Sequence, residues 1–316
     1  MGASLYRAIL WRRNDGLGGL IILLAAVCAL YAVLFPGIFA LSSIGHFAQD
    51  WLPFALVAAA EAVVMLTGGI DLAVGAMVGL GSVVAATTMG GPFGIAGGVV
   101  AVLGLGVAVG TAVGLIVAVG RLPAIIVTLA TSFIISGVAL LVLPQPGGMI
   151  PAALSRFLAG SRPTALFILL ALPVLWRLFL ATPFGIALFA IGENPVGAYR
   201  SGVNVVSVRV AAYAISGALQ AAAGLFVAAQ TGSGDPLIGQ PYTLNAIAAA
   251  VLGGVSFLGG QGTMRGALAG SLLMTVLINV MFFLGLPPVV QYVVQGVIIV
   301  GAVTLPRLRR RWRRVA

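Results

Sequence analysis

The sequence predicts an all-α integral membrane protein with about ten transmembrane helices. Three observations support this: 61% of the 316 residues are apolar, 7% are charged, and the mean hydropathy is +1.19. A soluble domain carries roughly 25% charged residues. The 16 basic and 6 acidic residues of this chain could not cover a water-facing globule of its length. The composition therefore excludes a soluble enzyme, a disordered chain and a disulfide scaffold.

Each predicted span is a run of about 20 predominantly apolar residues. The first, 17–35, could be mistaken for a secretory signal, but it lacks a convincing small-residue cleavage site and is expected to stay as a helix. The next spans are expected at 51–66, 72–89, 93–119, 123–143, 163–181, 209–229, 243–258, 266–284 and 287–305. The connections between them are short, except 144–162 and 182–208. We therefore expect one transmembrane domain over 1–316.

The positions of the arginines predict the orientation of these spans. If the N-terminus is cytoplasmic, fourteen arginines fall inside, and two, Arg156 and Arg162, fall outside. Such an excess on one side follows the positive-inside rule. An even number of spans also keeps the basic N-terminal segment, 1–16, and the basic tail, 306–316, together in the cytoplasm. A basic tail directly after an apolar span is a topology signal at anionic lipid, so no nucleic-acid partner is expected.

Residue types that are scarce or absent exclude several kinds of chemistry. All sixteen basic residues are arginine, so neither a Walker A phosphate site nor a Schiff-base mechanism, which both need lysine, can exist in this chain. Cys28 is the single cysteine and His46 the single histidine. These counts exclude an intrachain disulfide and multi-histidine metal sites. We expect no catalytic residue, metal or cofactor in this chain.

Glycine patterns predict close helix packing and two broken helices. The 44 glycines are about twice the average usage. Some recur at four-residue spacing, which puts them on one helix face: 75 and 79; 106, 110 and 114; 262, 266 and 270. These faces could pack within one chain, which is the leading interpretation, or form a dimer contact. Two spans taken as about 16 residues long each run into a glycine pair, Gly68-Gly69 and Gly253-Gly254, which is typical of broken helices that line a transport site.

Two acidic residues fall at membrane depth, where a carboxylate is costly and usually faces the protein interior or a water-filled path. Asp71 precedes an apolar helix, so it could be a helix N-cap or have a transport role. Glu61 has no evident partner in its own span and is expected to pair across helices. A proton-coupled carrier would use both acids as relays.

Uncharged amides also lie in or near the spans. They could hold helices together or contact a polyhydroxylated solute, because each offers donors and acceptors without charge. Those taken as candidates for a translocation path are Asn245, Asn279, Gln291 and Gln295; Gln220 and Gln230 belong to the same class. The outer loop 231–242 could meet a partner protein or be a plain solvated loop.

The inner loop 182–208 contains a strong helix start. Asn194 suits the N-cap and Pro195 the first helical position, while Gly202 suits the position just after the end. The predicted helix, 195–201, would be about 10 Å long. This segment is either a surface connection or a docking helix for a cytoplasmic partner that supplies ATP hydrolysis.

Three segments resemble the permease subunits of ribose-type ABC sugar importers, a family that includes ribose, xylose, arabinose, galactose and autoinducer-2 permeases. They are MLTGGIDLAVGA (65–76), TPFGIALFAIGENPVGAYRSGVN (182–204) and NAIAAAVLGGVSFLGGQGTMRGALAGSLLM (245–274). The resemblance extends from about residue 20 to 305. GGIDL, GENP and LGGxSxxGGxG are specific when they occur together in this order.

The resemblance implies a permease dimer in the bacterial inner membrane, a cytoplasmic ABC ATPase that binds ATP and Mg, and an extracytoplasmic solute-binding protein. It implies an ATPase-coupling loop with Gly192, Glu193, Asn194, Pro195, Ser201 and Gly202. It also matches Gly68, Gly69 and Asp71 to the first motif, and Gly253, Gly254, Ser256, Gly259, Gly260 and Gly262 to the third. Departures at Ala73, Val196, Gly197, Tyr199 and Asn245 concern which ATPase and solute are used, and whether the dimer is a homodimer or a heterodimer.

The predicted function is therefore that of a membrane-spanning permease subunit of an ABC importer, carrying a sugar or a related polyhydroxylated solute. The main alternative is a proton-coupled secondary transporter that uses Glu61 and Asp71. A passive channel is a further alternative. A membrane enzyme is the least favoured class, because the sequence offers no evident cluster of nucleophile, base and orienting group.

Overall fold

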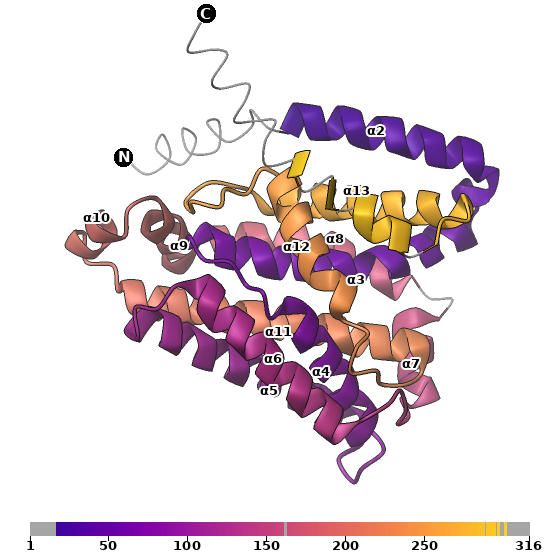
Figure 1. Ribbon diagram of the computed structural model, residues 1–316, viewed down its shortest axis with the longest axis horizontal. Coiled ribbons are helices and arrows are strands. Elements are labelled where there is room, and N and C mark those ends of the chain that lie inside the picture. Colours follow the sequence, from indigo (N-terminus) through magenta and orange to yellow (C-terminus); the bar gives the residue numbers. More distant parts are fainter. Residues whose placement is uncertain (1–16, 161–162, 288, 295, 298–299, 302–316) are drawn as a thin grey trace, which may run out of the picture.

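The structure is a computed structural model that describes residues 17–160, 163–287, 289–294, 296–297 and 300–301. Every named element in these ranges is a helix, and most of the longer helices lie roughly along the horizontal axis of Figure 1. The prediction of an all-α protein is thus confirmed for the described part of the chain.

Nine of the predicted spans correspond to helices of the structure. Their bounds are α2 Leu17–Leu34, α3 Leu41–Leu66, α4 Val74–Thr88, α5 Gly94–Val119, α6 Ala124–Val142, α8 Thr164–Leu180, α11 Val205–Thr231, α12 Gln240–Leu252 and α13 Met264–Phe283. Of the predicted last span, 289–294 and 296–297 are helical. The termini 1–16 and 306–316, Arg162 and Gln295 lie outside the described residues.

The helix α3 corrects one expectation. It has 26 residues and begins at Leu41, so the span before Gly68-Gly69 is not about 16 residues long. The polar residues His46, Gln49 and Asp50 had ended the apolar run, but none of them prevents helical hydrogen bonding. Pro53 also lies within α3. Hydropathy therefore marked the apolar part of this helix and not its start.

Four short helices lie in segments that were predicted to be connections between spans, and only one of the four was predicted as a helix. They are η1 Pro36–Phe39, α7 Ala152–Ala159, α9 Pro183–Glu193 and α10 Pro195–Arg200. The start of α10 is the predicted one, and it ends one residue earlier than expected. The helix α9 was missed, although Thr182-Pro183 is a start signal of the same kind: the Thr182 hydroxyl accepts the Gly185 N–H at 3.2 Å.

The number of membrane spans is supported only in part. By length and composition, five described helices could cross a membrane, or six if α7 and α8 together form one bent span. With 15 and 13 residues, α4 and α12 are about 22 Å and 20 Å long, shorter than a hydrocarbon core of about 30 Å. Ten spans therefore remains a prediction, in which non-helical segments would complete the paths of the two short helices.

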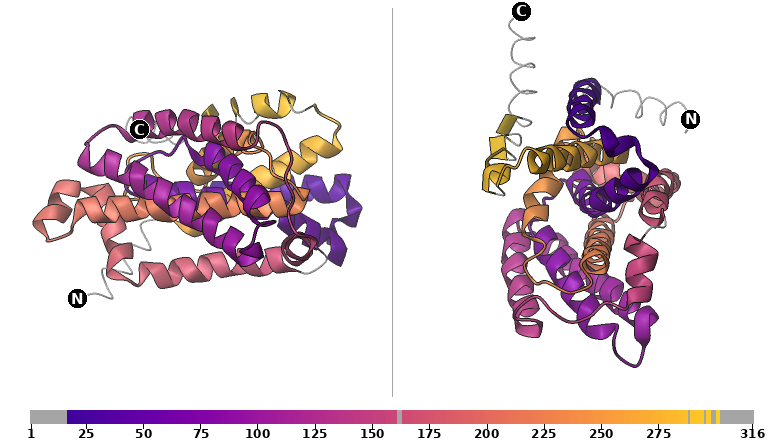
Figure 2. Two further views of the ribbon diagram at one scale, coloured as in Figure 1. Left: turned by 90° about the horizontal axis from the view of Figure 1, so that it is seen from below. Right: turned by 90° about the vertical axis from the view of Figure 1, so that its right-hand side faces the viewer.

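The helices divide into inner and outer ones. In the most apolar stretch of α3, 83% of the residues are buried, and the corresponding share is 61% for α11. For α5 and α6 these shares are 28% and 22%, so their apolar side chains are largely exposed. The end-on view in Figure 2 (right) places α11 among helices from both halves of the chain, and α11 packs against α3, α4 and α5. Exposed apolar outer helices fit a lipid surface.

The glycines that recur at four-residue spacing, here called glycine ladders, face the interior of the chain. A Cβ atom on Gly106 or Gly110 would collide with backbone atoms of Gly217 or Tyr213, so these glycines seat α5 on α11. Gly270 in the same way meets Ala249, where α13 packs on α12. These ladders therefore serve helix packing within one chain, which is the leading interpretation from the sequence.

The first ladder brings the two short helices together. A Cβ atom on Gly75 would meet Gly239 and Thr243, at the start of α12. The Gly75 N–H also donates a hydrogen bond to the Thr243 hydroxyl at 2.9 Å. The helix α4, which follows the first glycine pair, and the helix α12, which precedes the second, are thus neighbours inside the bundle (Figure 1).

Candidate functional site: two broken helices and a short exposed helix

The first break lies between α3 and α4. The helix α3 ends at Leu66, and Gly68 adopts the left-handed conformation, with φ of +81°, which costs glycine little and other residues more. The N–H groups of Thr67, Gly68 and Gly69 bond back to carbonyl groups of the last turn of α3. From there to Ala73 the chain is not helical, so its backbone groups need partners from elsewhere.

Buried side chains of α3 and α6 supply partners for this backbone, and a side chain of α11 bonds the Asp71 carboxylate. Glu61 of α3 accepts the Asp71 N–H at 3.2 Å. The Thr128 hydroxyl of α6 accepts the Leu72 N–H and can donate its one hydrogen to the Ile70 carbonyl, both at 3.1 Å. Gln220 of α11 donates to the Asp71 carboxylate at 2.8 Å. The break is therefore a tightly held segment of irregular backbone inside the protein, which is where such backbone is tolerated at membrane depth.

Asp71 joins the break to α11 and to the start of α4. Its Oδ1 accepts the Ala73 N–H at 2.9 Å, and its Oδ2 accepts from Gln220. The other hydrogen of the Gln220 amide can go to the Ser216 hydroxyl, 2.8 Å away. The N-cap position of α4 belongs to Ala73, so the expectation that Asp71 is the N-cap residue is wrong in register. Asp71 instead closes an Asx turn immediately before the helix.

Glu61 is fully buried, with 0% of its surface exposed. We expected it to pair with another helix, but its hydrogen-bond partner is backbone of the segment that follows its own helix. Its second oxygen, Oε2, and the hydroxyl of Tyr213 have no hydrogen-bond partner among the described residues.

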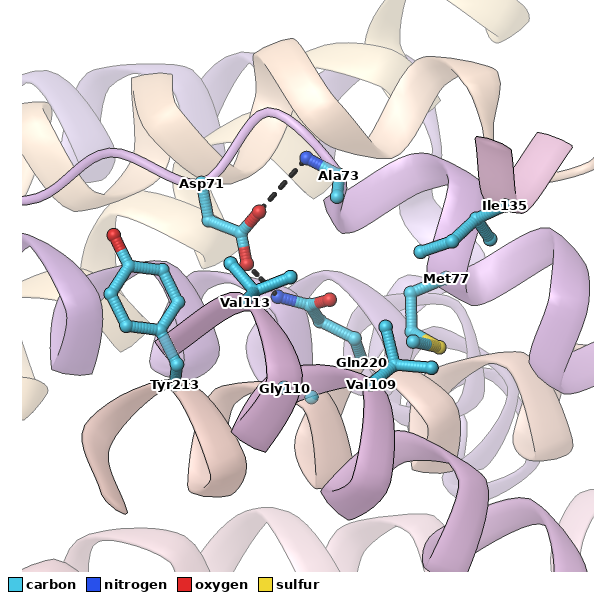
Figure 3. A pocket seen from close by; sticks show the side chains of 10 residues that line it. Asp71, Ala73, Met77, Val109, Gly110, Val113, Ile135, Tyr213 and Gln220 are labelled. Atoms are coloured by element: carbon cyan, nitrogen blue, oxygen red, sulfur yellow. Dashed lines mark hydrogen bonds between the residues drawn. The ribbon is translucent and has the colours of Figure 1, made fainter. Parts of the chain in front are cut away.

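A small pocket lies beside this cluster, between α4, α5, α6 and α11. Figure 3 shows Asp71 and Tyr213 toward one side of it, with Val113 beside them, and the apolar side chains of Met77, Val109 and Ile135 toward the other. Its lining consists of Asp71, Ala73, Met77, Val109, Gly110, Val113, Ile135, Tyr213, Gly217 and Gln220. The one charged residue of this lining is Asp71, which belongs to the first break.

The second break lies between α12 and α13, over residues 253–263. Gly254, Gly259, Gly260 and Gly262 all have positive φ, so the segment turns repeatedly without becoming helical. Ser256 stabilises it: its N–H donates to the Gln261 carbonyl at 2.9 Å, and its hydroxyl accepts the Leu258 N–H at 3.1 Å. The segment ends at Thr263, whose side chain caps α13. Both predicted glycine breaks are thus points where a helix ends.

The third segment contains the predicted docking helix. Asn194 caps α10 by accepting the Gly197 N–H at 2.9 Å, and Gly202, with φ of +85°, follows its end. Val196 and Tyr199 are exposed on α10 by 59% and 72%, and Glu193 is also exposed. Figure 1 shows α9 and α10 at one end of the bundle and α7 at the other. The short helix therefore offers an apolar and aromatic surface that this chain leaves uncovered.

The three motif segments, far apart in the sequence, meet at one point. The Gly260 N–H donates to the Leu66 carbonyl at 3.0 Å, which ties the second break to the end of α3. A Cβ atom on Gly192, at the end of α9, would collide with both groups of that hydrogen bond. We call these contacts among Leu66, Gly68, Gly192, Glu193, Gly259 and Gly260 the glycine junction.

The remaining candidate residues are not brought together. Asn245 of α12 is 1% exposed, and neither of its amide atoms has a partner among the described residues. Asn279 is half-buried, about 22 Å along α13 from Met264 at 1.5 Å per residue, where it lies beside Asp50. Gln291 donates to the Leu286 carbonyl at 3.4 Å. These amides therefore form no single cluster with Glu61 and Asp71.

Sequence reasoning missed some residues that hold the first break. Thr128, Ser216 and Tyr213 were not singled out, although each is at most 1% exposed. Hydroxyl groups are common in apolar helices, where they usually bond to the preceding turn. The single hydrogen of the Thr128 hydroxyl can go either to the Ala124 carbonyl in this ordinary way, at 2.9 Å, or to the Ile70 carbonyl, so its contact with the first break has no local signal.

Comparisons with known proteins show which chains this one is similar to. Residues 43–303 match the family described as branched-chain amino acid transport system / permease component. The ribose import permease protein of Escherichia coli (strain K12) is 33% identical over 90% of this chain and 91% of its own length. The galactose/methyl galactoside import permease protein of Salmonella typhimurium is 33% identical over 92% and 94%, and the autoinducer 2 import system permease protein of Yersinia enterocolitica 32% over 94% and 84%. No solved structure matches the chain.

Proposed function

The chain belongs to the family described as branched-chain amino acid transport system / permease component, and from this membership we propose that it is the membrane-spanning subunit of an ABC importer for a sugar or related polyhydroxylated solute. The observation that carries the proposal is near full-length similarity to permeases named for ribose, galactose and autoinducer 2 import. Uncharged and carboxylate hydrogen-bonding groups inside an apolar bundle suit such a solute.

The energy source is proposed to be a separate cytoplasmic ATPase that docks on α10. The lysine-free sequence cannot form a Walker A site, so ATP and Mg would be bound by the partner. Val196 and Tyr199, exposed on a helix that Asn194 caps, provide a preformed surface for it. Aromatic side chains of this kind are common anchors at protein interfaces.

The orientation follows from the arginines. Arg177, Arg200 and Arg209 lie at the end of α8, on α10 and near the start of α11, where the chain passes through α9 and α10. Arg156 lies on α7, at the opposite end of the bundle (Figure 1). We place the α10 end in the cytoplasm of a bacterium, with both termini on that side and the α7 end facing outward. An extracytoplasmic binding protein would deliver the solute there.

The complete transporter is proposed to contain two permease subunits in the inner membrane, as a homodimer or a heterodimer. Solute would pass between them as both rock from outward-facing to inward-facing states. Glu61, Gly68, Gly69, Asp71, Gly253, Gly254, Ser256, Asn245, Asn279, Gln291 and Gln295 remain candidates for the path or its support. Of these, Glu61 and Asp71 are bonded inside one chain, so we assign them to holding the first break and not to relaying protons.

An uptake assay tests the proposed function. The chain would be reconstituted in liposomes with the ATPase and binding protein of the same transport system, and radiolabelled ribose and galactose would be the probes. We expect uptake that needs ATP and both partners. Uptake by the chain alone under a pH gradient would instead establish a proton-coupled carrier, and uptake without either energy source would establish a channel.

Docking on α10 is tested by replacing Pro195 and Gly202 by alanine together. The change removes the preset first turn and strains the left-handed residue after the helix, so α10 should fray. We expect co-purification of the ATPase to weaken by roughly tenfold, which corresponds to about 1.4 kcal/mol of binding free energy. The control is Gly232→Ala, which imposes the same strain at φ of +73° after α11. Equal co-purification in both variants would contradict docking on α10.

A further inference from the structure

The glycine junction is a contact of backbone on backbone. A Cβ atom on Gly259 would lie 2.7 Å from the Gly68 nitrogen and 3.0 Å from the Gly192 Cα atom. A Cβ atom on Gly260 would lie 2.6 Å from the nitrogen and 2.8 Å from the Cα atom of Glu193. Real Cβ atoms do not approach this closely, so each position requires a glycine. The end of α9 is therefore wedged between the first and the second break.

Such a contact transmits displacement efficiently. Where side chains separate two helices, a small movement can be absorbed by rotamer changes, because side chains rearrange more easily than backbone. At the glycine junction the atoms nearest to Gly192 and Gly259 are backbone atoms of the other two segments, and those nearest to Gly260 are the backbone and Cβ of Glu193. The hydrogen bond between Leu66 and Gly260 also joins the two breaks to each other, so both would move with a displacement at Gly192.

The same residues lead directly to α10. The helix α9 ends at Glu193, and Asn194 alone separates it from the first residue of α10. While α9 is packed into the bundle, α10 is largely exposed at its end. The end of α9 therefore contacts both broken helices, and the exposed helix α10 that follows it can contact a partner.

We propose that Gly192 and Glu193 are positioning residues that carry movement of α10 to both broken helices at once. The proposal rests on the proposed function, since it assumes that a nucleotide-driven partner moves α10. It goes further by naming the point of transmission. Nucleotide binding at the partner would shift the Gly253–Gly262 segment and the Thr67–Ala73 segment together, through backbone contact and without rearrangement of side chains.

A spin label in the second break tests the proposal. Cys28 is replaced by alanine, and Leu258, which is 87% exposed in that break, is replaced by cysteine and labelled with a nitroxide. In the complex with the ATPase, a non-hydrolysable ATP analogue should change the line shape at position 258. A label at Phe133→Cys, exposed on α6, should not respond.

Two variants test the role of Gly192 itself. Gly192→Ala should remove most of the nucleotide-induced change at position 258 while the ATPase still co-purifies. Gly137→Ala is the matched control, because a Cβ atom at Gly137 in α6 meets nothing within 4 Å. If Gly192→Ala does not fold, two glycines inserted between Glu193 and Asn194 provide a second variant. This insertion makes the connection between α9 and α10 flexible at an exposed point and leaves the glycine junction intact.

The outcomes separate this inference from the proposed function. If uptake depends on ATP but the label at position 258 does not respond, or responds equally in Gly192→Ala and Gly137→Ala, the transmission through Gly192 is refuted and the importer function stands. A normal response in the glycine-insertion variant would also refute it. If the ATPase does not associate and no ATP-dependent uptake occurs, the proposed function itself fails.

Discussion

Gly110→Ala is expected to lower the free energy of unfolding by about 3 kcal/mol or more, because the added methyl group has no room. At this position a Cβ atom would overlap the Tyr213 carbonyl group and lie 3.0 Å from the Ala214 Cα atom. Both are backbone atoms of α11, the helix that also presents Gln220 to Asp71. Relief would therefore require α5 and α11 to separate, which would also disturb the first break. Thermal unfolding of purified protein in detergent measures the effect.

Gly104→Ala is the matched control for this prediction. It lies on α5 as well, but a Cβ atom there meets nothing within 4 Å. Since alanine is favoured over glycine inside a helix by roughly 0.5–1 kcal/mol, this variant should be as stable as the parent or slightly more stable. If the two variants unfold at the same temperature, α5 and α11 are not in backbone contact at Gly110.

Removing the Asp71 carboxylate is expected to be nearly as damaging. Asp71→Ala leaves the Ala73 N–H and one Gln220 amide hydrogen without their partners in a buried place. An unsatisfied buried group costs about 1–3 kcal/mol, and hydrogen bonds to charged groups are at the upper end of the usual range. We expect Gln220→Ala to be destabilising too, and the double variant to be less damaging than the sum of the two.

A double-mutant cycle on Asp71 and Gln220 measures this coupling, which should be about 1.5–3 kcal/mol. Uptake should fall in parallel, because the bond holds the first break against α11. Asp71→Ala combined with Ser132→Ala serves as the comparison pair, since the Ser132 hydroxyl bonds to Leu129 within its own helix. Strict additivity in the Asp71 and Gln220 cycle would show that the two side chains do not interact.

Local features of the site could be predicted from the sequence. Asn194-Pro195 placed the start of α10 correctly, because a cap is a hydrogen bond between residues three apart. The glycine pairs correctly located the ends of α3 and α12, since Gly68 and Gly254 adopt left-handed conformations that glycine accepts at little cost. Thr182-Pro183 is the same type of signal at the start of α9, but no helix was predicted for that segment.

Partners distant in the sequence could not be predicted. The bond from Gln220 to Asp71 spans 149 residues, and the two bonds of Thr128 to the first break span 56 and 58. Every polar residue in an apolar span needs some partner, but the sequence does not say which one. For Glu61, the expectation of a partner on another helix was wrong because backbone of the following segment folds back onto it.

By itself, the sequence determined that this protein lies in a membrane, that it is helical, that it cannot bind ATP through a Walker A site, and which three segments carry its family resemblance. These properties depend on composition and on contacts between near neighbours. Only the tertiary structure decided that the glycine ladders face inward and that Leu66, Gly192 and Gly260 meet at one point. Those contacts arise when helices far apart in the chain pack face to face, and glycine permits such an approach without specifying its partner.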